Sequence, residues 1–496
     1  MMNLDTVESV IGSGPYDDGW ASLCNAQAPE WFADAKFGIF THWGLYTVSE
    51  YRNEWYSRNM YIEGYPEFDH HRAAYGPQKD FGYKDFIPLF TAERFDADTW
   101  LDLFREAGAR YYMPVAEHHD GFQMYRSELS CWNAYDMGPH RDILGELREA
   151  SERHGLHFAA SNHRAEHWWF MGHGRDVDSD VREPMTKGDF YWPAMPEPNE
   201  FDVRSEPAPT REFLEDWLLR ICEIVDAYRP ELLYFDWWVQ HEAFKPYLRK
   251  FAAFYYNRGV QWGRRVSICY KYDGMAWSSG IVDVERGGFP EATPFVWQTD
   301  TAIARNSWCH TDSLDYKTAP ELVVALIDAV SKNGNLLLNV GPRADGSIDE
   351  RDRDLLLAIG RWLAVNGEGM YGSRPWRITQ EGPTKQDGGM FAENNATEWT
   401  ADDWRFTTRG GDVYAFCLNP VAPAAHGMLR IATFAAYHDG VKPPFNGIVD
   451  RVEQLGAGEV RYRREPDGMY ITPLPREPDE AATAARLQNH HPLSAR

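Results

Sequence analysis

A single carboxylate stands among aromatic residues in the stretch YFDWW, residues 234–238. Asp236 follows an apolar run that begins at Leu232, and burying its ionised form without a partner would cost several kcal/mol. The carboxylate is therefore either satisfied by neighbouring groups or placed where a ligand meets it. Alternate residues of a strand face the same side, so we expect the ring of Tyr234 to lie beside Asp236 and to form one wall of a pocket.

Other side chains capable of acid–base or ligand chemistry follow further β-like runs. In a barrel of parallel strands, polar residues at the carboxyl ends of the strands point toward the ligand site. By that rule the candidates are His42, Glu54, His118, His119, His163 and His167. We expect these side chains to surround the same site as Asp236.

Metal-dependent hydrolysis is one chemistry that such histidines could serve. The sequence contains neither HExxH nor a His-x-His at the end of the first run. The adjacent His118 and His119 would also point to opposite faces if both lay on a strand. We therefore expect no metal. A serine nucleophile is not indicated either, because the sequence has no G-x-S-x-G elbow.

Paired carboxylates are the chemistry that remains. A retaining glycosidase uses one carboxylate as nucleophile and one carboxylic acid as proton donor, about 5 to 5.5 Å apart. Asp236 has the position for the nucleophile. The proton donor must come from a later strand or loop, and the segment VDVERGGFPEATPFVW offers Asp283, Glu285 and Glu291.

The elements that must position these residues alternate between short apolar runs and amphipathic helices. The runs number about eight, which favours a (β/α)₈ barrel within residues 1–375. They include residues 37–43, 110–122, 156–163, 231–238, 266–270, 295–299 and 335–341. A doubly wound open sheet is the alternative, although no G-x-G-x-x-G follows a strand to support its dinucleotide-binding form.

The pattern changes to short alternating strands after the proposed barrel. The segments DVYAFCLN and VRYRREPDGMYITP are typical of antiparallel strands, and Pro466-Asp467-Gly468 in the second predicts a turn. We expect a small C-terminal β-sandwich over residues 376–475. Residues 476–496 lack apolar periodicity, which predicts a mobile tail.

Composition limits the partners. The net charge is −25, with 75 acidic and 50 basic residues, so we expect no binding to nucleic acid or to anionic membranes. Aromatic residues make up 15% of the chain; rings that stack on sugar faces would explain this, and an aromatic-rich core explains it equally well. Neither a signal peptide nor a bilayer-spanning stretch is recognisable, which predicts a cytoplasmic protein. Homo-oligomerisation is left open.

Seven segments, in order, resemble glycoside hydrolase family 29, the α-L-fucosidases. They are WFADAKFGIFTHWG, NEWY, HHDGF, GPHRDILGEL, LLYFDWW, SWCH and SKNGNLLLNVGPRADGSI. The resemblance implies a retaining exo-hydrolase that removes terminal α-L-fucose from a glycan or oligosaccharide through a covalent glycosyl-enzyme intermediate. It also implies a barrel followed by a β-sandwich, with no cofactor.

The resemblance assigns roles to individual residues. The family's nucleophile falls on Asp236. The matching sugar-binding positions are His42, Glu54, Trp55, His118, His119 and Trp308. A lone histidine is more often a hydrogen-bonding residue of the core, but three histidines at predicted strand ends in matching motifs favour contact with a ligand.

The sequence departs from the family pattern at the proton donor. Many members carry a glutamate directly after the tryptophan of the seventh strand, whereas this chain has Trp297-Gln298. An amide cannot donate and recover a proton at neutral pH, so Gln298 is excluded. Glu285 is our choice for the acid/base because of its position ahead of that tryptophan, and Glu291 is the alternative.

Two further family residues have no counterpart. The tyrosine that often follows the third strand is missing, and so is the arginine after the fifth strand. His163 and Lys271 are donors of suitable reach that could replace them at the substrate, although a solvated Lys271 is an equally good interpretation. These changes leave open a fucose-like sugar, such as an L-galactose-like or β-D-galactose-like one. A sugar-binding protein without turnover is a third hypothesis.

Overall fold

A computed structural model describes residues 1–271, 273–394, 398–420, 427–474 and 483–489. Eight parallel strands close into a barrel in sequence order. They are β1 (Phe37–Thr41), β2 (Tyr111–Glu117), β3 (His157–Asn162), β4 (Leu232–Phe235), β5 (Ser267–Lys271), β6 (Ile281–Asp283), β7 (Trp297–Ala302) and β8 (Gly334–Val340). Because β1 pairs with both β2 and β8, the sheet has no open edge. The predicted (β/α)₈ barrel is confirmed, and the open-sheet alternative is wrong.

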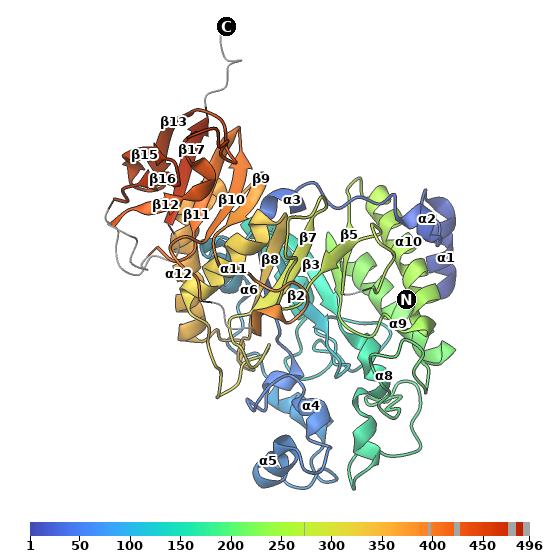
Figure 1. Ribbon diagram of the computed structural model, residues 1–496. Coiled ribbons are helices and arrows are strands. Elements are labelled where there is room, and N and C mark those ends of the chain that lie inside the picture. Colours follow the sequence, from blue (N-terminus) through green and yellow to red (C-terminus); the bar gives the residue numbers. More distant parts are fainter. Residues whose placement is uncertain (272, 395–397, 421–426, 475–482, 490–496) are drawn as a thin grey trace.

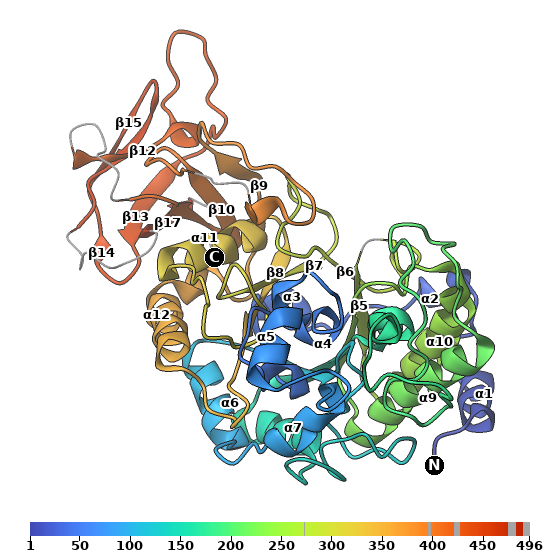
Figure 2. The same cartoon turned by 90° about the horizontal axis from the view of Figure 1, so that it is seen from below.

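Six long helices surround the barrel (Figures 1 and 2). They are α6 (Ala97–Glu106), α7 (Ile143–His154), α9 (Arg211–Tyr228), α10 (Lys245–Gln261), α11 (Ala319–Ser331) and α12 (Glu350–Asn366). Local signals set their ends: the Asp96 carboxylate accepts the Thr99 N–H at the start of α6, and Gly155 ends α7 in the left-handed conformation.

Shorter helices occupy the two ends of the barrel (Figure 1). On the amino-terminal side of the strands lies α3 (Phe32–Ala35), whereas α1 (Leu4–Ser13) and α2 (Trp20–Leu23) pack against α10 on the outside of the barrel. The loops at the carboxyl ends carry α4 (Tyr56–Asn59), α5 (Pro66–Ala74) and α8 (His167–Phe170). Loops at this end of a (β/α)₈ barrel form the ligand site.

Strand β6 was not among the predicted runs. It has three residues, too few for a periodic apolar signal. Its place is set by pairing with both neighbours, Lys271 with Asp283 and Asp283 with Gln298. As a result, Glu285 lies just beyond the carboxyl end of a barrel strand rather than in the middle of a long loop.

Two antiparallel sheets follow the barrel. One has the order β14-β13-β17-β11-β10-β9 and the other β12-β16-β15. Their bounds are β9 (Arg374–Glu381), β10 (Trp404–Arg409), β11 (Asp412–Cys417), β12 (Leu429–Ile431), β13 (Val449–Gln454), β14 (Gly458–Glu459), β15 (Tyr462–Glu465), β16 (Gly468–Ile471) and β17 (Thr483–Asn489). A shared apolar core that includes Trp404, Ile431 and Met469 joins the sheets, which confirms the predicted C-terminal β-sandwich. The domain bounds themselves stay predictions.

The C-terminal segment differs from the predicted mobile tail. Thr483–Asn489 forms β17, which pairs with β11 and β13 near the middle of the larger sheet. The prediction is therefore wrong for these residues. These residues are held in an extended conformation by backbone pairing with strands distant in the sequence, which a search for local apolar periodicity cannot detect. The other parts of the predicted tail, 476–482 and 490–496, lie outside the described residues.

Among the described helices, none combines the length and the apolar character needed to cross a bilayer.

Candidate active site

The Asp236 carboxylate lies directly beyond the end of β4 and is surrounded by donors. His163 Nδ1 lies 3.0 Å from Asp236 Oδ2, and His119 Nε2 lies 3.4 Å from the same oxygen. Lys271 Nζ lies 3.2 Å from Oδ1. Burial by itself would raise the pKa of Asp236, but the Lys271 ammonium, followed by the histidines, holds that pKa well below its usual range. The carboxylate is ionised and held in place.

Lys271, the last residue of β5, is only 2% exposed. Besides Asp236, its ammonium contacts Glu285 Oε2 and lies 3.5 Å from Asp300 Oδ2. Burial opposes its charge, yet the surrounding carboxylates raise the pKa of Lys271 well above its usual value. The interpretation of Lys271 as a solvated surface residue is therefore wrong.

Glu285 lies two residues beyond β6 and is buried. Trp237 Nε1 donates to its Oε2 at 3.3 Å. Burial raises the pKa of Glu285 to about 7; the charges of Asp300 and Asp236 add to this rise, and Lys271 opposes it. A carboxyl group with such a pKa can both give and take a proton near neutral pH.

Further polar side chains line the barrel interior below this pair of carboxyl groups. The Tyr234 hydroxyl donates to Asp300 Oδ2 at 2.9 Å, and Lys271 Nζ lies 5.5 Å from the centre of the Tyr234 ring. Tyr234 therefore lies beneath the ammonium. Gln298 donates to Asp283 Oδ2 at 2.8 Å and accepts the Tyr111 hydroxyl at 2.9 Å, so both ends of the amide are used inside the barrel.

The histidines form one cluster. Ring centres are 4.3 Å apart for His118 and His119 and 4.8 Å apart for His118 and His163. His42 lies 5.6 Å from His118, and its Nδ1 is 2.7 Å from Asn339 Oδ1. The expectation that His118 and His119 face opposite sides is wrong, because β2 ends at Glu117 and strand alternation no longer applies beyond it.

The cluster contains an unsatisfied donor or acceptor. His118 is buried, and its Nδ1 has no hydrogen-bond partner among the described residues. Burial and the neighbouring histidines hold the pKa of His118 well below its usual value, so the ring is neutral. A buried, unpaired ring nitrogen at the mouth of a barrel is suited to a hydroxyl group of a ligand.

Among the described residues, three sets of side chains are close enough to hold a metal ion, with ligand atoms within 4.8 Å of one another in each set. Two lie in the histidine cluster: His42, His118 and His163, and His119, His163 and Asp236. The third is Glu50, His310 and Asp312. Several of these atoms already have protein partners. His163 Nε2 lies 3.0 Å from Ser161 Oγ, and its Nδ1 contacts Asp236. The absence of a metal stays a prediction.

The remaining predicted sugar-binding residues adjoin the histidines. Glu54 Oε2 accepts a hydrogen bond from the backbone N–H of Trp308 at 3.0 Å. Burial raises the pKa of Glu54. The Trp308 ring lies 5.1 Å from His42, and the Trp55 ring lies 6.0 Å from His119. Both tryptophans are half-buried, so part of each ring is open to a ligand.

Glu291, the alternative proton donor, lies elsewhere. It is exposed, and its Oε1 accepts Gln380 Nε2 at 3.3 Å. The sequence reasoning missed Asp300, which adds to the raised pKa of Glu285. A signal was available, because Asp300 is two residues beyond Gln298 and therefore shares its face of the strand.

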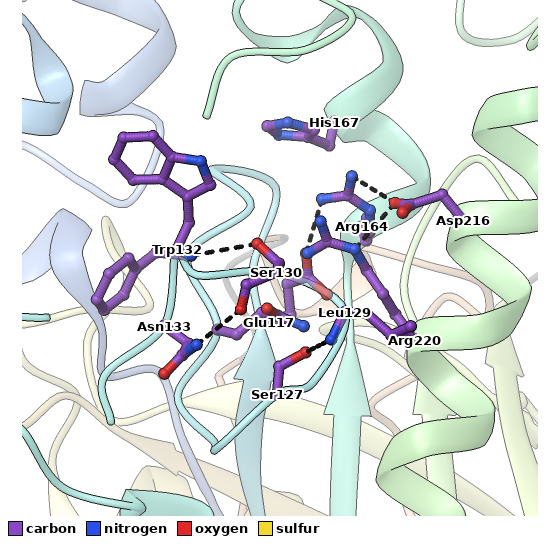
Figure 3. Close-up of polar contacts among 12 residues, drawn as sticks. Glu117, Ser127, Leu129, Ser130, Trp132, Asn133, Arg164, His167, Asp216 and Arg220 are labelled. Carbon is purple, nitrogen blue, oxygen red and sulfur yellow. Dashed lines mark hydrogen bonds and ion pairs between the residues drawn. The ribbon is translucent and has the colours of Figure 1, made fainter. Parts of the chain in front are cut away.

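An ion-pair network outside the barrel supports the histidine loops (Figure 3). Arg164 contacts Glu117 Oε1 at 2.8 Å and Asp216 Oδ2 at 2.9 Å. Arg220 of α9 contacts the same two carboxylates at 3.0 and 2.9 Å. Glu117 immediately precedes His118 and Arg164 immediately follows His163, so the network ties the ends of β2 and β3 to α9. His167 belongs to this support, because its Nδ1 lies 2.8 Å from the His119 carbonyl oxygen.

Known proteins share this architecture. The family model described as Alpha-L-fucosidase matches residues 4–368. Human tissue alpha-L-fucosidase is 29% identical over 98% of this chain and 94% of its own length. Human plasma alpha-L-fucosidase is 34% identical over 73% of each chain. The crystal structure of Thermotoga maritima alpha-fucosidase in complex with fucose has 26% identity and a TM-score of 0.72, covering 95% of this chain and all (100%) of that one. The chain therefore belongs to the α-L-fucosidase family of glycoside hydrolases.

Proposed function

We propose that the chain is a retaining exo-α-L-fucosidase in which Asp236 is the nucleophile and Glu285 the acid/base. The observation that carries this proposal is the shared contact of both side chains with Lys271, combined with opposite shifts of their pKa values. One carboxyl group is ionised and the other is protonated up to about pH 7. Two carboxyl groups with pKa values moved apart are the requirement for this chemistry.

The reaction follows from these protonation states. An Asp236 oxygen attacks the anomeric carbon, and Glu285 gives its proton to the oxygen of the departing aglycone, so the glycosidic bond breaks as the ester bond forms. Glu285, now ionised, then takes a proton from water. That water attacks the anomeric carbon and releases Asp236, which regenerates both groups.

The spacing of the two acids supports retention of configuration. Asp236 Oδ1 and Glu285 Oε2 both contact Lys271 Nζ, so these two oxygens are closer than the separation of about 6.5 to 9.5 Å used by inverting enzymes. An inverting enzyme needs that extra distance for a water molecule behind the sugar.

We assign the sugar contacts to the residues that border the two acids. They are His42, Glu54, Trp55, His118, His119 and Trp308. The unpaired His118 Nδ1 supports contact with a sugar hydroxyl, and the half-buried tryptophans offer ring faces. His163 and Lys271 are already held against Asp236, so we assign them to orienting the nucleophile, and Tyr234 to supporting Lys271 from below. The substrate is a fucosylated glycan or oligosaccharide, as the resemblance and the relatives' names suggest.

A substrate panel with product analysis tests the proposal. Release of nitrophenol should be fastest from the α-L-fucoside, compared with the α-L-galactoside and the β-D-galactoside. Proton NMR at early times should show α-L-fucose as the first product. Faster release from a galactoside would reassign the sugar, first formation of β-L-fucose would exclude retention, and binding of fucose without any release would indicate a sugar-binding protein. A cytoplasmic location and the oligomeric state stay predictions.

A further inference from the structure

A segment beyond the barrel reaches back to the loop that carries Glu285. It belongs to the connection between β9 and β10. The Phe391 N–H donates to the Glu285 carbonyl at 2.8 Å, and the Glu393 N–H donates to the Arg286 carbonyl at 2.9 Å. Gly288 and Gly389 exchange two further backbone hydrogen bonds, at 3.2 and 2.8 Å. The segment therefore pairs with the acid/base loop almost as an added strand would.

The Glu393 side chain anchors this pairing. Its Oε1 contacts Arg286 Nη1 at 3.0 Å and Lys317 Nζ at 2.9 Å. The Thr301 hydroxyl, on β7, donates to Oε2 at 2.7 Å. Burial would raise the pKa of Glu393, but Lys317 and Arg286 hold it below its usual value. One ionised carboxylate from outside the barrel therefore forms ion pairs with two cations at the barrel mouth.

The paired backbones are held in a conformation that side-chain-bearing residues rarely adopt. Arg286 has φ of 44° and Phe391 has φ of 58°, both in the left-handed region. Such conformations persist where the surroundings hold them, and they are frequent at functional sites. Here the surroundings are the hydrogen bonds and the Glu393 ion pairs described above.

Arg286 also connects this anchor to the sugar-binding wall. Its guanidinium carbon lies 4.5 Å from the centre of the Trp308 ring. The backbone N–H of Trp308 donates to Glu54. By fixing Arg286, Glu393 keeps this guanidinium over the tryptophan. The Glu285 carboxyl is then faced by Lys271 of β5, by Asp236 beyond β4 and by Asp300 of β7.

We propose that Glu393 is a positioning residue for the acid/base, which makes a segment outside the barrel part of the active site. This inference rests on the proposed role of Glu285. Glu393 lies beyond the residues 4–368 that match the family model. Loss of its charge releases the loop from its left-handed turn, moves the Glu285 carboxyl from its place beside the leaving oxygen, and leaves Arg286 over Trp308 without its counter-charge.

The test uses Glu393→Gln, which removes the charge and keeps the size. A displacement of catalytic groups by about 1 Å can cost about 100-fold, so kcat on a fucosyl disaccharide should fall about ten- to 100-fold. An activated aryl fucoside needs little protonation of its leaving group, so its kcat should change far less. Loss of one negative charge at the barrel mouth should also lower the pKa of Glu285 and move the basic limb of the pH profile to lower pH. Glu393→Asp, which keeps the charge, should restore the basic limb.

Asp402→Asn is the matched control. Asp402 is a carboxylate of the C-terminal sandwich that pairs with Arg430, whose Nη2 lies 3.2 Å away, and this ion pair does not involve the barrel. The control should show no dependence on the leaving group. Equal losses on both substrates in Glu393→Gln, or unchanged kinetics, would overturn the inference. Glu285→Ala distinguishes failure of the proposed function from failure of this inference. If Glu285→Ala shows the leaving-group dependence and Glu393→Gln does not, Glu285 keeps its role as acid/base and only the role of Glu393 is refuted.

Discussion

The two sides of the barrel mouth place a buried carboxyl group in opposite surroundings. Beyond β4, Asp236 faces His119, His163 and the ammonium of Lys271. Beyond β6, Glu285 shares that same ammonium with other carboxylates. Burial acts in the same direction on both groups, because it penalises the charged form. The pKa nevertheless falls at Asp236 and rises at Glu285.

The donors and the like charges around each carboxyl group therefore decide its protonation state. Asp236 has three nitrogen donors at 3.4 Å or less. Glu285 has Lys271 and the uncharged indole N–H of Trp237 as donors. The negative charges of Asp300 and Asp236 also raise the pKa of Glu285. A single lysine thus serves both sides. The following changes remove the features that distinguish the two sides, beginning with the largest expected effect.

Asp236→Gly removes the nucleophile and should cause the largest loss. We expect kcat to fall by at least about 10³-fold, because the covalent step is lost, while circular dichroism and thermal unfolding remain close to those of the unmodified protein. Added azide or formate should restore part of the turnover by occupying the vacated space. Near-normal activity of this variant would show that Asp236 is not the nucleophile.

Glu285→Ala should produce a smaller loss that depends on the leaving group. On a fucosyl disaccharide we expect kcat to fall about 10²- to 10⁴-fold, the usual contribution of a general acid. An activated aryl fucoside should suffer less, the basic limb near pH 7 should flatten, and azide, which attacks the β-linked glycosyl-enzyme from the opposite face, should yield α-fucosyl azide.

Glu291→Ala is the control for this variant, since Glu291 is exposed and contacts Gln380. If Glu291→Ala shows the leaving-group dependence and Glu285→Ala does not, the acid/base is Glu291. If neither shows it, Glu54 is the next candidate, because burial also raises its pKa.

Lys271→Met should shift the pH profile more than it lowers the maximal rate. The ammonium lowers the pKa of both Asp236 and Glu285, so its loss raises both values. Ionised Asp236 sets the acidic limb and protonated Glu285 sets the basic limb, and both should move to higher pH by about 1 unit or more. Lys271→Arg, which keeps the charge, should leave the limbs near their original positions. Unmoved limbs in Lys271→Met would mean that Lys271 does not control the two acids.

Chelation should have the smallest effect. We expect EDTA to leave kcat/KM unchanged, because the proposed reaction uses only carboxyl groups and because His163 and Asp236 already bind each other. Loss of activity with EDTA, followed by recovery on addition of zinc, would instead show that one of the two sets in the histidine cluster holds a catalytic metal.

The amino-acid sequence was sufficient to predict the barrel, most of its strands and most of the residues near the site. Apolar runs that alternate with capped helices have few solutions other than a (β/α)₈ barrel, and polar residues after such runs necessarily meet at one end. Asp236 and the histidines could therefore be placed together without coordinates, whereas Glu285 was chosen through the resemblance to the α-L-fucosidases. The short strand β6 and the C-terminal strand β17 were not predicted, because their extended conformation depends on pairing with neighbouring strands and not on a local apolar pattern.

The charge states of the site residues could be read only from the folded structure. The sequence could name Lys271 as a donor, but its contact with three carboxylates depends on how β5, β6 and β7 close the barrel beyond β4. Likewise, Glu393 lies 107 residues after Arg286, and no local pattern links the two. A pKa depends on burial and on charges within a few ångströms, and such distances are set by the packing of remote segments and not by spacing along the chain.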